Sequence, residues 1–163
     1  MRKNFDEKNQ EEIAKFVLDN LPRHKQFALG TIDENGSPWV VCLNLAYDDK
    51  LNIIWKSKKD TEHSKHIATN KNVSICVYSN DEKVGDFGFY TKVVAHEVSD
   101  EKELEKCLDF RYKRKNKEIP PLSELLGDSD ARIYIAEIRE AWVSDNRHLK
   151  TKVDMKVLRS ILN

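Results

Sequence analysis

The sequence has only three cysteines among its 163 residues, and they are scattered without a CxxC pair. An odd, scattered set of cysteines argues against a disulfide framework and against a zinc knuckle. No apolar run approaches the roughly 20 residues that a membrane-spanning helix needs, and the N-terminal segment lacks the apolar stretch of a signal peptide. We therefore expect a cytoplasmic protein that does not span a membrane.

The sequence also lacks an excess of either charge. Its 28 Lys and Arg residues are balanced by 28 Asp and Glu residues, so the formal net charge at pH 7 is zero. A neutral chain gives no electrostatic basis for a nucleic-acid-binding surface. The phosphate loop GxxxxGKS/T, the dinucleotide fingerprint GxGxxG and the nucleophile elbow GxSxG are absent as well. The sequence therefore gives no support for these nucleotide-binding and hydrolase classes.

Short β-strands dominate what the sequence does contain. Period-two alternation of apolar residues predicts strands at residues 27–32, 39–45, 51–55, 73–78, 87–98 and 132–138. Asn35-Gly36, between the first two of these segments, is typical of a tight hairpin turn. Short strands separated by turns favour an antiparallel barrel or sandwich. We expect a single domain over residues 1–163 of the mainly β class, a β-barrel with peripheral helices.

Helices are expected at both ends of the chain and between strands. Ile13, Phe16, Val17 and Leu21 recur with the 3.6-residue period of an amphipathic helix, which Pro22 ends. We assign the N-terminal helical segment to residues 1–22, with the helix itself over 6–21. Further helices are expected at residues 61–69, 101–115, 122–126 and 152–163. The third cysteine, Cys107, is expected at a buried position of the 101–115 helix.

The polar segment 56–66 interrupts the strands and carries most of the candidate chemistry. It contains four lysines against two acidic residues, and its hydroxyl groups come from Ser57, Thr61 and Ser64. A helix is expected to begin within the segment, which leaves backbone N–H groups unpaired. Cations, hydroxyls and a helix N-terminus together form a good phosphate site. A solvated lysine-rich loop is the alternative interpretation of the same residues.

Two histidines in this segment raise the question of a metal. His63 and His66 are three residues apart and could share one helix face. A zinc site would need further ligands, and the sequence has neither an HExxH motif nor paired cysteines. We expect no metal site; a hydrogen bond from a histidine to phosphate, or simple surface exposure, are the alternatives.

The order of these segments resembles the FMN-binding split barrel of the pyridoxamine 5′-phosphate oxidase-like superfamily. The matching segments are residues 27–32 with Asn35-Gly36 and Pro38, residues 44–48, 53–57, 63–70 and 73–75, and the stretches 93–105 and 134–147. The most specific of them is His63 to Asn70, followed by Val73-Ser74-Ile75. The resemblance implies a split β-barrel of the FMN-binding type. It also implies a homodimer that holds FMN in clefts at the subunit interface.

The resemblance further implies which residues contact the cofactor. The phosphate-binding positions of the family fall on Lys56, Ser57, His63, Ser64 and Lys65. The flavin ring of the family lies against the second strand, here Val41, Cys42, Leu43 and Asn44. Trp142 and Arg147 resemble an aromatic and a basic residue that reach the flavin of the partner subunit. Catalytic residues stay unassigned, because no side chain is an evident catalytic acid or base.

Departures from the family pattern narrow the expected activity. Val41 stands where pyridoxamine phosphate oxidases begin the second strand with a basic residue, and Ala46 replaces a lysine for the substrate phosphate. The C-terminal Arg-x-His pair is replaced by adjacent Arg147-His148. Binding a B6 phosphate needs several converging cations, so true pyridoxamine phosphate oxidase activity is not expected.

The sequence therefore predicts an FMN-binding protein that acts as a flavin-dependent oxidoreductase on an unidentified small substrate. One alternative is a carrier or sensor of flavin or haem without enzymatic activity. Another is an enzyme of the same fold that uses the deazaflavin F420. Haem ligands could come from His24, His63, His66, His96 or His148, none of which the sequence singles out.

Overall fold

The computed structural model describes residues 6, 9–79, 86–113, 116–144 and 150–162. The described strands are β1 (Gln26–Ile32), β2 (Pro38–Asn44), β3 (Ile53–Lys58), β4 (Asn72–Ser79), β5 (Phe87–Glu97), β6 (Ala131–Ser144) and β7 (Lys150–Val153). They form a seven-stranded sheet in the order β2-β1-β4-β5-β6-β3, with β7 paired to β6. Neighbouring strands run antiparallel throughout these pairings.

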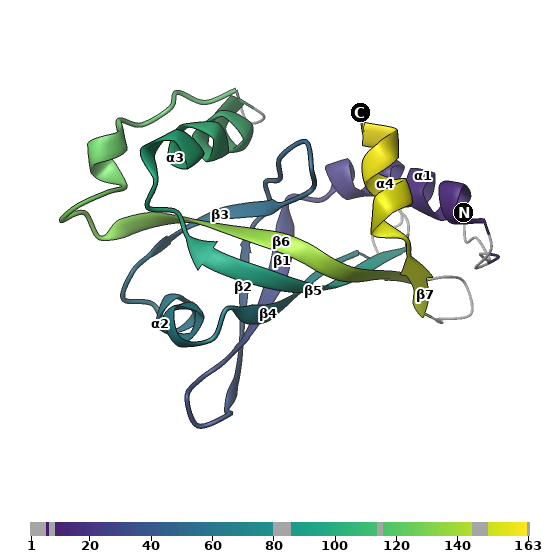
Figure 1. The fold of residues 1–163 in the computed structure, drawn as a ribbon, viewed down its shortest axis with the longest axis horizontal. Coiled ribbons are helices and arrows are strands. Elements are labelled where there is room, and N and C mark those ends of the chain that lie inside the picture. The colour runs from purple at the N-terminus through teal and green to yellow at the C-terminus, as the bar shows by residue number, and fades with distance from the viewer. Residues whose placement is uncertain (1–5, 7–8, 80–85, 114–115, 145–149, 163) are drawn as a thin grey trace.

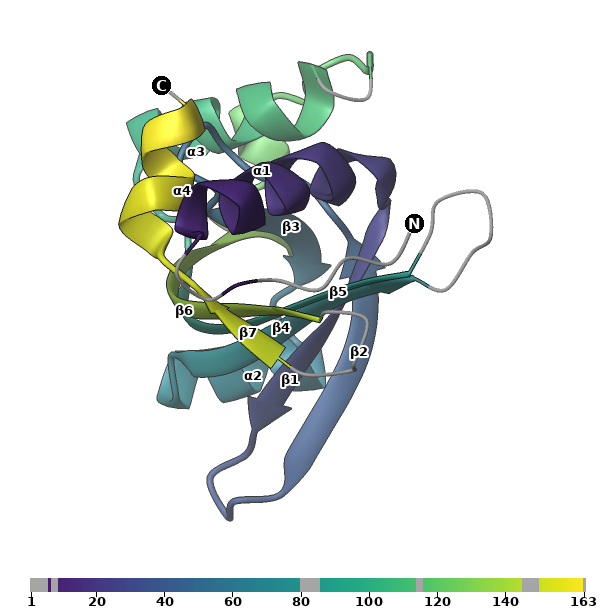
Figure 2. The ribbon, with the colours of Figure 1, turned by 90° about the vertical axis from the view of Figure 1, so that its right-hand side faces the viewer.

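The sheet curls so that its two edge strands return to each other at one point (Figures 1 and 2). An isolated antiparallel bridge joins Tyr47 to Ile53, and the Ile54 amide donates to the Ala46 carbonyl at 2.8 Å. Beyond this bridge β2 and β3 are not paired with each other in the described part of the chain. The result is a split barrel, open between β2 and β3, as the sequence predicted.

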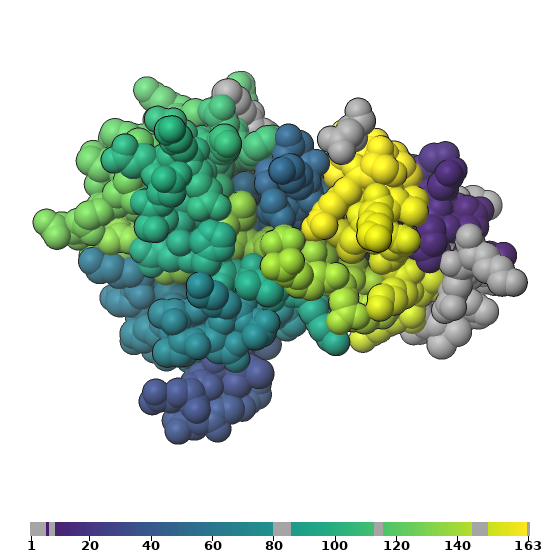
Figure 3. All heavy atoms as spheres, viewed as in Figure 1, coloured from purple at the N-terminus to yellow at the C-terminus, as the bar shows by residue number. Residues whose placement is uncertain are grey.

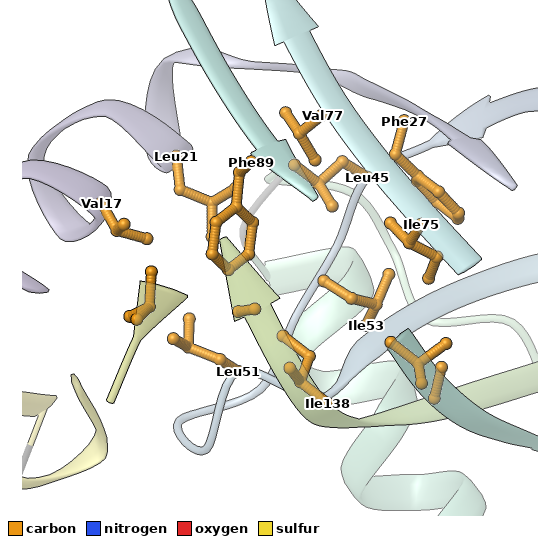
Figure 4. Close-up of a cluster of buried hydrophobic side chains, with 14 of the residues drawn as sticks. Val17, Leu21, Phe27, Leu45, Leu51, Ile53, Ile75, Val77, Phe89 and Ile138 are labelled. Carbon is orange, nitrogen blue, oxygen red and sulfur yellow. The ribbon is translucent and has the colours of Figure 1, made fainter. Parts of the chain in front are cut away.

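Alternating residues of the strands fill the inside of this curl. Phe27 and Leu29 of β1 are buried while their neighbours on the strand are half-exposed, as expected for a sheet with one face in the core. Trp55 of β3 is fully buried and stacks on Tyr134 of β6 with 5.6 Å between ring centroids. Figure 4 shows the apolar side chains of the strands meeting those of the N-terminal helix in one cluster.

Helices cover both sides of the sheet. The α-helices are α1 (Gln10–Asn20), α2 (Glu62–Thr69), α3 (Glu101–Leu108) and α4 (Met155–Leu162). In Figure 1, α1, α3 and α4 lie above the strands, with α1 beside α4, and α2 lies below them near the β1–β2 hairpin. Helices α1 and α2 both add buried residues to the main apolar cluster, whereas α3 packs on the opposite face of β3 and β6. Three shorter elements are helical turns, Leu21–Arg23, Asp109–Lys113 and Leu122–Glu124. No helix in the described ranges has the length and apolarity required to cross a membrane.

Helix α3 covers a second, smaller apolar cluster on the outer side of β3 and β6. Cys107 is buried in this cluster, as predicted for its position on the helix. Burial, followed by the charges of Glu103 and Asp48, raises the pKa of the Cys107 thiol to about 12. The thiol is therefore protonated at neutral pH and packs as a small apolar group.

Several boundaries differ from the sequence-based expectations. The N-terminal helix is shorter than 1–22 because Asn9 caps it, its side chain accepting the Glu12 amide at 3.2 Å. The first two residues of the expected C-terminal helix 152–163 belong instead to strand β7 (Lys150–Val153), and the helix begins only at Met155. The third strand does not end at Trp55 but continues to Lys58, because Lys56 to Lys58 keep pairing with the start of β6.

Candidate functional site

Polar side chains gather where β3 ends and α2 begins. The Ser57 hydroxyl lies 2.7 Å from Nε2 of His63, and the Thr61 hydroxyl lies 3.2 Å from the same nitrogen. Thr61 donates to Ser64 Oγ at 2.8 Å, and Ser64 donates to the Lys58 carbonyl at 2.8 Å. The structure thus brings Ser57, His63 and Ser64 into one hydrogen-bonded network, and Thr61 completes it.

The imidazole of this network is buried and electrically neutral. His63 and Ser64 are only 5% and 3% exposed. Burial, followed by the nearby charge of His66, lowers the pKa of His63. At neutral pH the ring therefore carries one N–H and one acceptor nitrogen. The neutral His63 ring is hydrogen-bonded to the Ser57 and Thr61 hydroxyls and adds no positive charge to the site.

The first turn of α2 has donors that no side chain satisfies. Thr61 is the N-cap residue, yet its side chain makes no capping hydrogen bond. Its hydroxyl points instead to Ser64 and to the Lys58 carbonyl. The first N–H groups of a helix have no partners within the helix. Here they remain available to an anion, which the positive end of the helix dipole would favour.

The lysines around this helix start differ in their availability. Lys65 lies 3.4 Å from Glu62, and Lys59 lies 3.9 Å from Asp130. Lys56 and Lys58 make no ion pair with the described residues. Lys56 is half-buried and Lys58 is exposed. Of the two lysines that the sequence predicted at the phosphate, Lys56 is therefore without an ion pair among the described residues, and Lys65 lies beside Glu62.

A second polar group lies behind the network and was missed by the sequence analysis. The Arg132 guanidinium is 7% exposed and donates to Glu97 at 2.9 Å. It also donates to the carbonyls of Gly127, Ser129 and Ala131. Arg132 pairs directly with Ser57 across the β3–β6 ladder, so it anchors the strand that presents the network. No local motif joins two residues 35 positions apart, and the sequence offered no signal for this pair.

Tyr134 links the two groups. Its hydroxyl donates to Glu97 at 3.4 Å, and it also makes a hydrogen bond with Ser64. Burial is the main cause that raises the pKa of Tyr134. The phenol therefore stays protonated and holds the hydroxyl network against the Arg132–Glu97 pair.

The predicted ring-binding strand lies on the opposite edge of the split. Val41 and Leu43 are half-buried on the inner side of β2, and Cys42 and Asn44 are exposed on its outer side. Asn44 lies three residues before Tyr47 of the edge bridge, and Lys56 lies three residues after Ile53. Both are therefore roughly 10 Å from the bridge along their strands. The residues predicted to bind the ring and those predicted to bind the phosphate thus lie on the two edges that diverge from one bridge.

The structure does not bring Trp142 to the same place. Trp142 lies on β6 nine residues beyond Ile133, the residue that pairs with Lys56. At about 3.3 Å per residue this separates Trp142 from Lys56 by roughly 30 Å. Arg147, the other predicted contact to a partner's flavin, lies outside the described residues. Within one chain, Trp142 and the helix-start network belong to different regions.

A protein-family comparison agrees with this architecture. The family model for pyridoxamine 5′-phosphate oxidase matches residues 10–143, which span all strands from β1 to most of β6. The chain belongs to this family. Among curated proteins, none matches the chain.

Several solved structures have the same fold as this chain, at low sequence identity. The heme binding protein from Mycobacterium smegmatis is 12% identical with a TM-score of 0.67, over 98% of this chain and 62% of that one. Campylobacter jejuni ChuZ is 16% identical with a TM-score of 0.68, over 94% and 65%. HutZ, the heme storage protein from Vibrio cholerae, is 20% identical with a TM-score of 0.64, over 85% and 96%. This chain thus spans less than two thirds of the mycobacterial and Campylobacter proteins.

Proposed function

We propose that this protein binds FMN at the split between β2 and β3 and acts as a flavin-dependent oxidoreductase on a small substrate. The observation that carries the proposal is the network of Ser57, Thr61, His63 and Ser64 at the uncapped start of α2. This set offers hydroxyl and backbone donors to the phosphate, which carries most of two negative charges near pH 7. The family of the chain supports a flavin as the ligand.

The two edges of the split would bind different parts of the cofactor. Ser57 and the first N–H groups of α2 would donate to phosphate oxygens, and Lys56 would supply positive charge. Ser64, whose hydroxyl already donates to the Lys58 carbonyl, would hold the end of β3 beside them. On the other edge, the half-buried Val41 and Leu43 would give the flavin ring an apolar surface, and backbone groups of residues 41–44 would meet its polar edge. FMN, when bound, supplies the redox chemistry, while the protein positions it and tunes its electrostatic surroundings.

A homodimer is part of the same proposal. Trp142 lies roughly 30 Å along β6 from the residue that pairs with Lys56, so only a second copy could bring it to a flavin whose phosphate is bound at Lys56 and Ser57. The outer face of the sheet, opposite the core, exposes Ile32, Val40 and Tyr78 to extents of 43%, 66% and 62%. Exposed apolar residues on one face favour contact with another protein surface. We assign that face to the partner subunit.

Oxidation of a B6 phosphate is not proposed. A second phosphate, that of the substrate, would need its own cations beside the flavin ring. The two positions where the family provides them are Val41, which is half-buried, and Ala46, which is fully buried. We infer a substrate without a phosphate group.

Haem is the second candidate, because the similar structures include proteins named for haem binding and storage. The histidines in the described residues are poorly placed as ligands. His63 and His66 are hydrogen-bonded to Ser57 and Thr31, and His96 lies 3.3 Å from Glu103. The Nε2 atom of His24 is buried beside Phe87. We therefore rank flavin above haem.

Spectroscopic titration tests the proposed site. FMN should bind the wild-type protein more tightly than riboflavin, because only FMN carries the phosphate. The double change Lys56→Ala and Ser57→Ala removes a charge and a hydroxyl donor, which should weaken FMN by about tenfold to a hundredfold. Riboflavin should bind both proteins equally.

A matched control replaces Lys71 and Ser123, which are exposed and lie away from the network. Lys71→Ala with Ser123→Ala should leave both affinities unchanged. Equal loss of FMN and riboflavin in the Lys56→Ala, Ser57→Ala protein would contradict the phosphate assignment. Tight binding of haemin with no binding of either flavin would replace flavin by haem.

A further inference from the structure

A groove separates helix α3 from the turn that joins β2 to β3. The turn covers residues 48–52 and lies between α3 and α4 (Figures 1 and 3). Two adjoining cavities of about 860 Å³ and 570 Å³ share Asp48, Asp49, Lys106 and Phe110 in their walls. Cavities of roughly 300–1,000 Å³ are typical of sites for small organic molecules. The groove is therefore large enough for a ligand of that class.

The groove lies on the side of β3 that faces away from the barrel core. Ile54 and Trp55 are consecutive on β3, so their side chains point to opposite faces of the sheet. Trp55 belongs to the main apolar cluster, whereas Ile54 belongs to the smaller cluster under α3 and lines the groove. None of the described residues that line the groove belongs to the helix-start network. The groove is thus separate from the site proposed for the FMN phosphate.

The floor of the groove is apolar. Ile54 is fully buried, and Cys107 and Ile135 are 2% and 9% exposed. The half-buried ring of Phe110 extends this apolar surface to Leu162 of α4. An apolar floor below a polar rim favours a ligand that has an apolar body and a few polar groups.

The wall formed by the turn is held in one conformation. Asp48 accepts from the Lys50 and Asn52 amides at 2.9 Å and 2.8 Å, and from the Asn52 side chain at 2.8 Å. Leu51 is fully buried with a φ of 62°, in the left-handed region that leucine rarely adopts. Arg159 of α4 donates to the Lys50 carbonyl at 3.3 Å. A wall that is fixed before a ligand arrives lowers the entropy cost of binding.

Unpaired charges of opposite sign lie on the two walls. Asp49 is an exposed carboxylate on the turn. Lys102 and Lys106 line the groove from α3, four residues apart, and both are exposed. None of these three residues makes an ion pair with another described residue. The groove therefore has a free carboxylate on one wall and two free ammonium groups on the other.

Two further acidic groups of the groove already have partners. Asp100 accepts from the Glu103 amide at 2.9 Å, and the Glu103 carboxylate lies 3.3 Å from His96. Lys50 adds one more exposed ammonium group on the turn. A ligand in the groove would therefore find Asp49 as its anionic partner and the lysines as its cationic partners.

We propose that this groove binds a free α-amino acid with a large apolar side chain. Asp49 holds the ammonium group of the amino acid, and Lys102 and Lys106 hold its carboxylate, in charge-assisted hydrogen bonds. The side chain of the amino acid lies on the floor, against Ile54 and Phe110. A ligand with a single charge would leave the charges of one wall without a partner, so the arrangement selects a zwitterion.

Calorimetric titration of the full-length protein tests the ligand class, with L-phenylalanine as the probe. N-acetyl-L-phenylalanine lacks the ammonium charge and L-phenylalanine amide lacks the carboxylate, so each should bind about tenfold more weakly. Glycine keeps both charges but has no side chain for the floor, and it should bind more weakly still. Equal affinity for L-phenylalanine and its two derivatives, or no binding of L-phenylalanine at millimolar concentration, would overturn the proposal.

Variants assign each charge of the ligand to its wall. Asp49→Asn should weaken L-phenylalanine by about tenfold and leave the N-acetyl derivative unchanged, because that derivative has no ammonium group. Lys102→Gln with Lys106→Gln should weaken L-phenylalanine to a similar extent and leave the amide unchanged. Loss of affinity for all three compounds in either variant would contradict the assignment of charges to walls.

Matched controls change exposed residues outside the groove. Asp128→Asn, and Lys15→Gln with Lys71→Gln, should leave the affinity for L-phenylalanine unchanged. Flavin titration of the groove variants should give the wild-type affinity, because the two sites share no described residue. Loss of flavin binding in Asp49→Asn would overturn the groove as a separate site.

Discussion

At the scale of single residues, neutral histidines are the most informative groups in this protein. His63 supports a hydroxyl network without adding charge, since its ring is buried between β3 and α2. His24 stacks on Phe87 with 4.9 Å between ring centroids, and its Nε2 atom is buried without a hydrogen-bond partner. Burial lowers the pKa of both rings. Each ring would have to take up a proton at a cost when the pH falls.

The unfolding free energy should therefore fall as the pH falls below about 6.5, the usual pKa of an exposed histidine. In that range the unfolded chain binds protons that the folded chain does not, so stability increases with pH. His24→Leu should reduce this dependence without abolishing it, because His63 still contributes. Denaturant unfolding at pH 7.5 and pH 5.5 measures the effect. An unchanged difference between the two pH values in His24→Leu would contradict this account.

At the scale of elements, the start of β6 decides where the candidate site lies. Six residues of β3 pair with β6, and this pairing carries Lys56 and Ser57 as strand residues up to the helix that follows. Arg132 holds the start of β6 to the end of β5 through Glu97 and to the preceding turn through three carbonyls. Lys56 and Ser57, the residues predicted to bind phosphate, therefore lie on a strand whose partner β6 is held to β5 by Arg132.

Arg132→Leu should destabilise the protein by about 2–3 kcal/mol, because it leaves buried carbonyl groups and Glu97 without their partner. The loss stays in this range because Glu97 is 43% exposed and can be rehydrated. Arg139→Leu is the matched control on the same strand. Its ion pair with Glu137 is about half-exposed on both sides, and its loss should cost less than about 1 kcal/mol. Equal denaturation midpoints for the two variants would contradict the anchoring role of Arg132.

At the scale of the whole molecule, the described surface is asymmetric. Helices α1, α3 and α4 gather at one side of the molecule, and the β1–β2 hairpin projects away from the body at the opposite side (Figures 1 and 3). Val40 on this hairpin and Tyr78 on β4 are exposed apolar residues of the outer face. A monomer would leave this apolar surface in water. The proposed dimer would bury it.

Light scattering coupled to size exclusion should therefore give about twice the chain mass of 19.0 kDa. Val40→Glu with Tyr78→Glu places two like charges at the contact, which should shift the protein toward the monomer. Flavin affinity should fall together with dimerisation. The circular dichroism spectrum should stay unchanged, because both side chains are already exposed. A dimer that persists with both substitutions would place the contact on another face.

Much of the fold followed from local patterns. Alternating apolar residues predicted the strands, Asn35-Gly36 predicted the first hairpin, and the order of segments resembled the split barrel that the structure and the family comparison confirm. The boundaries were less predictable. Lys56 to Lys58 are polar and were not assigned to a strand, since their place in the sheet depends on residues 131–133, far along the chain.

The candidate site likewise contains residues that the sequence could predict and residues that it could not. Ser57, His63 and Ser64 could be found from the sequence because they lie within eight residues of one another at a helix start. Arg132, Glu97 and Tyr134 could not, because they reach the site only when β5, β6 and β3 pair. The same holds for the ion pairs of Glu140 with Lys92 and Lys152, because the three residues come from three strands.

The sequence by itself determined the scattered cysteines, the zero net charge, the order of the strands and the hydroxyl-rich helix start. These are local or summed properties, and they do not depend on how distant segments meet. Only the tertiary structure decided that Arg132 pairs with Glu97, and that Trp142 lies far along β6 from Lys56 and Ser57. The physical reason is strand register: a ladder fixes which distant side chains become neighbours, and no single segment encodes it alone.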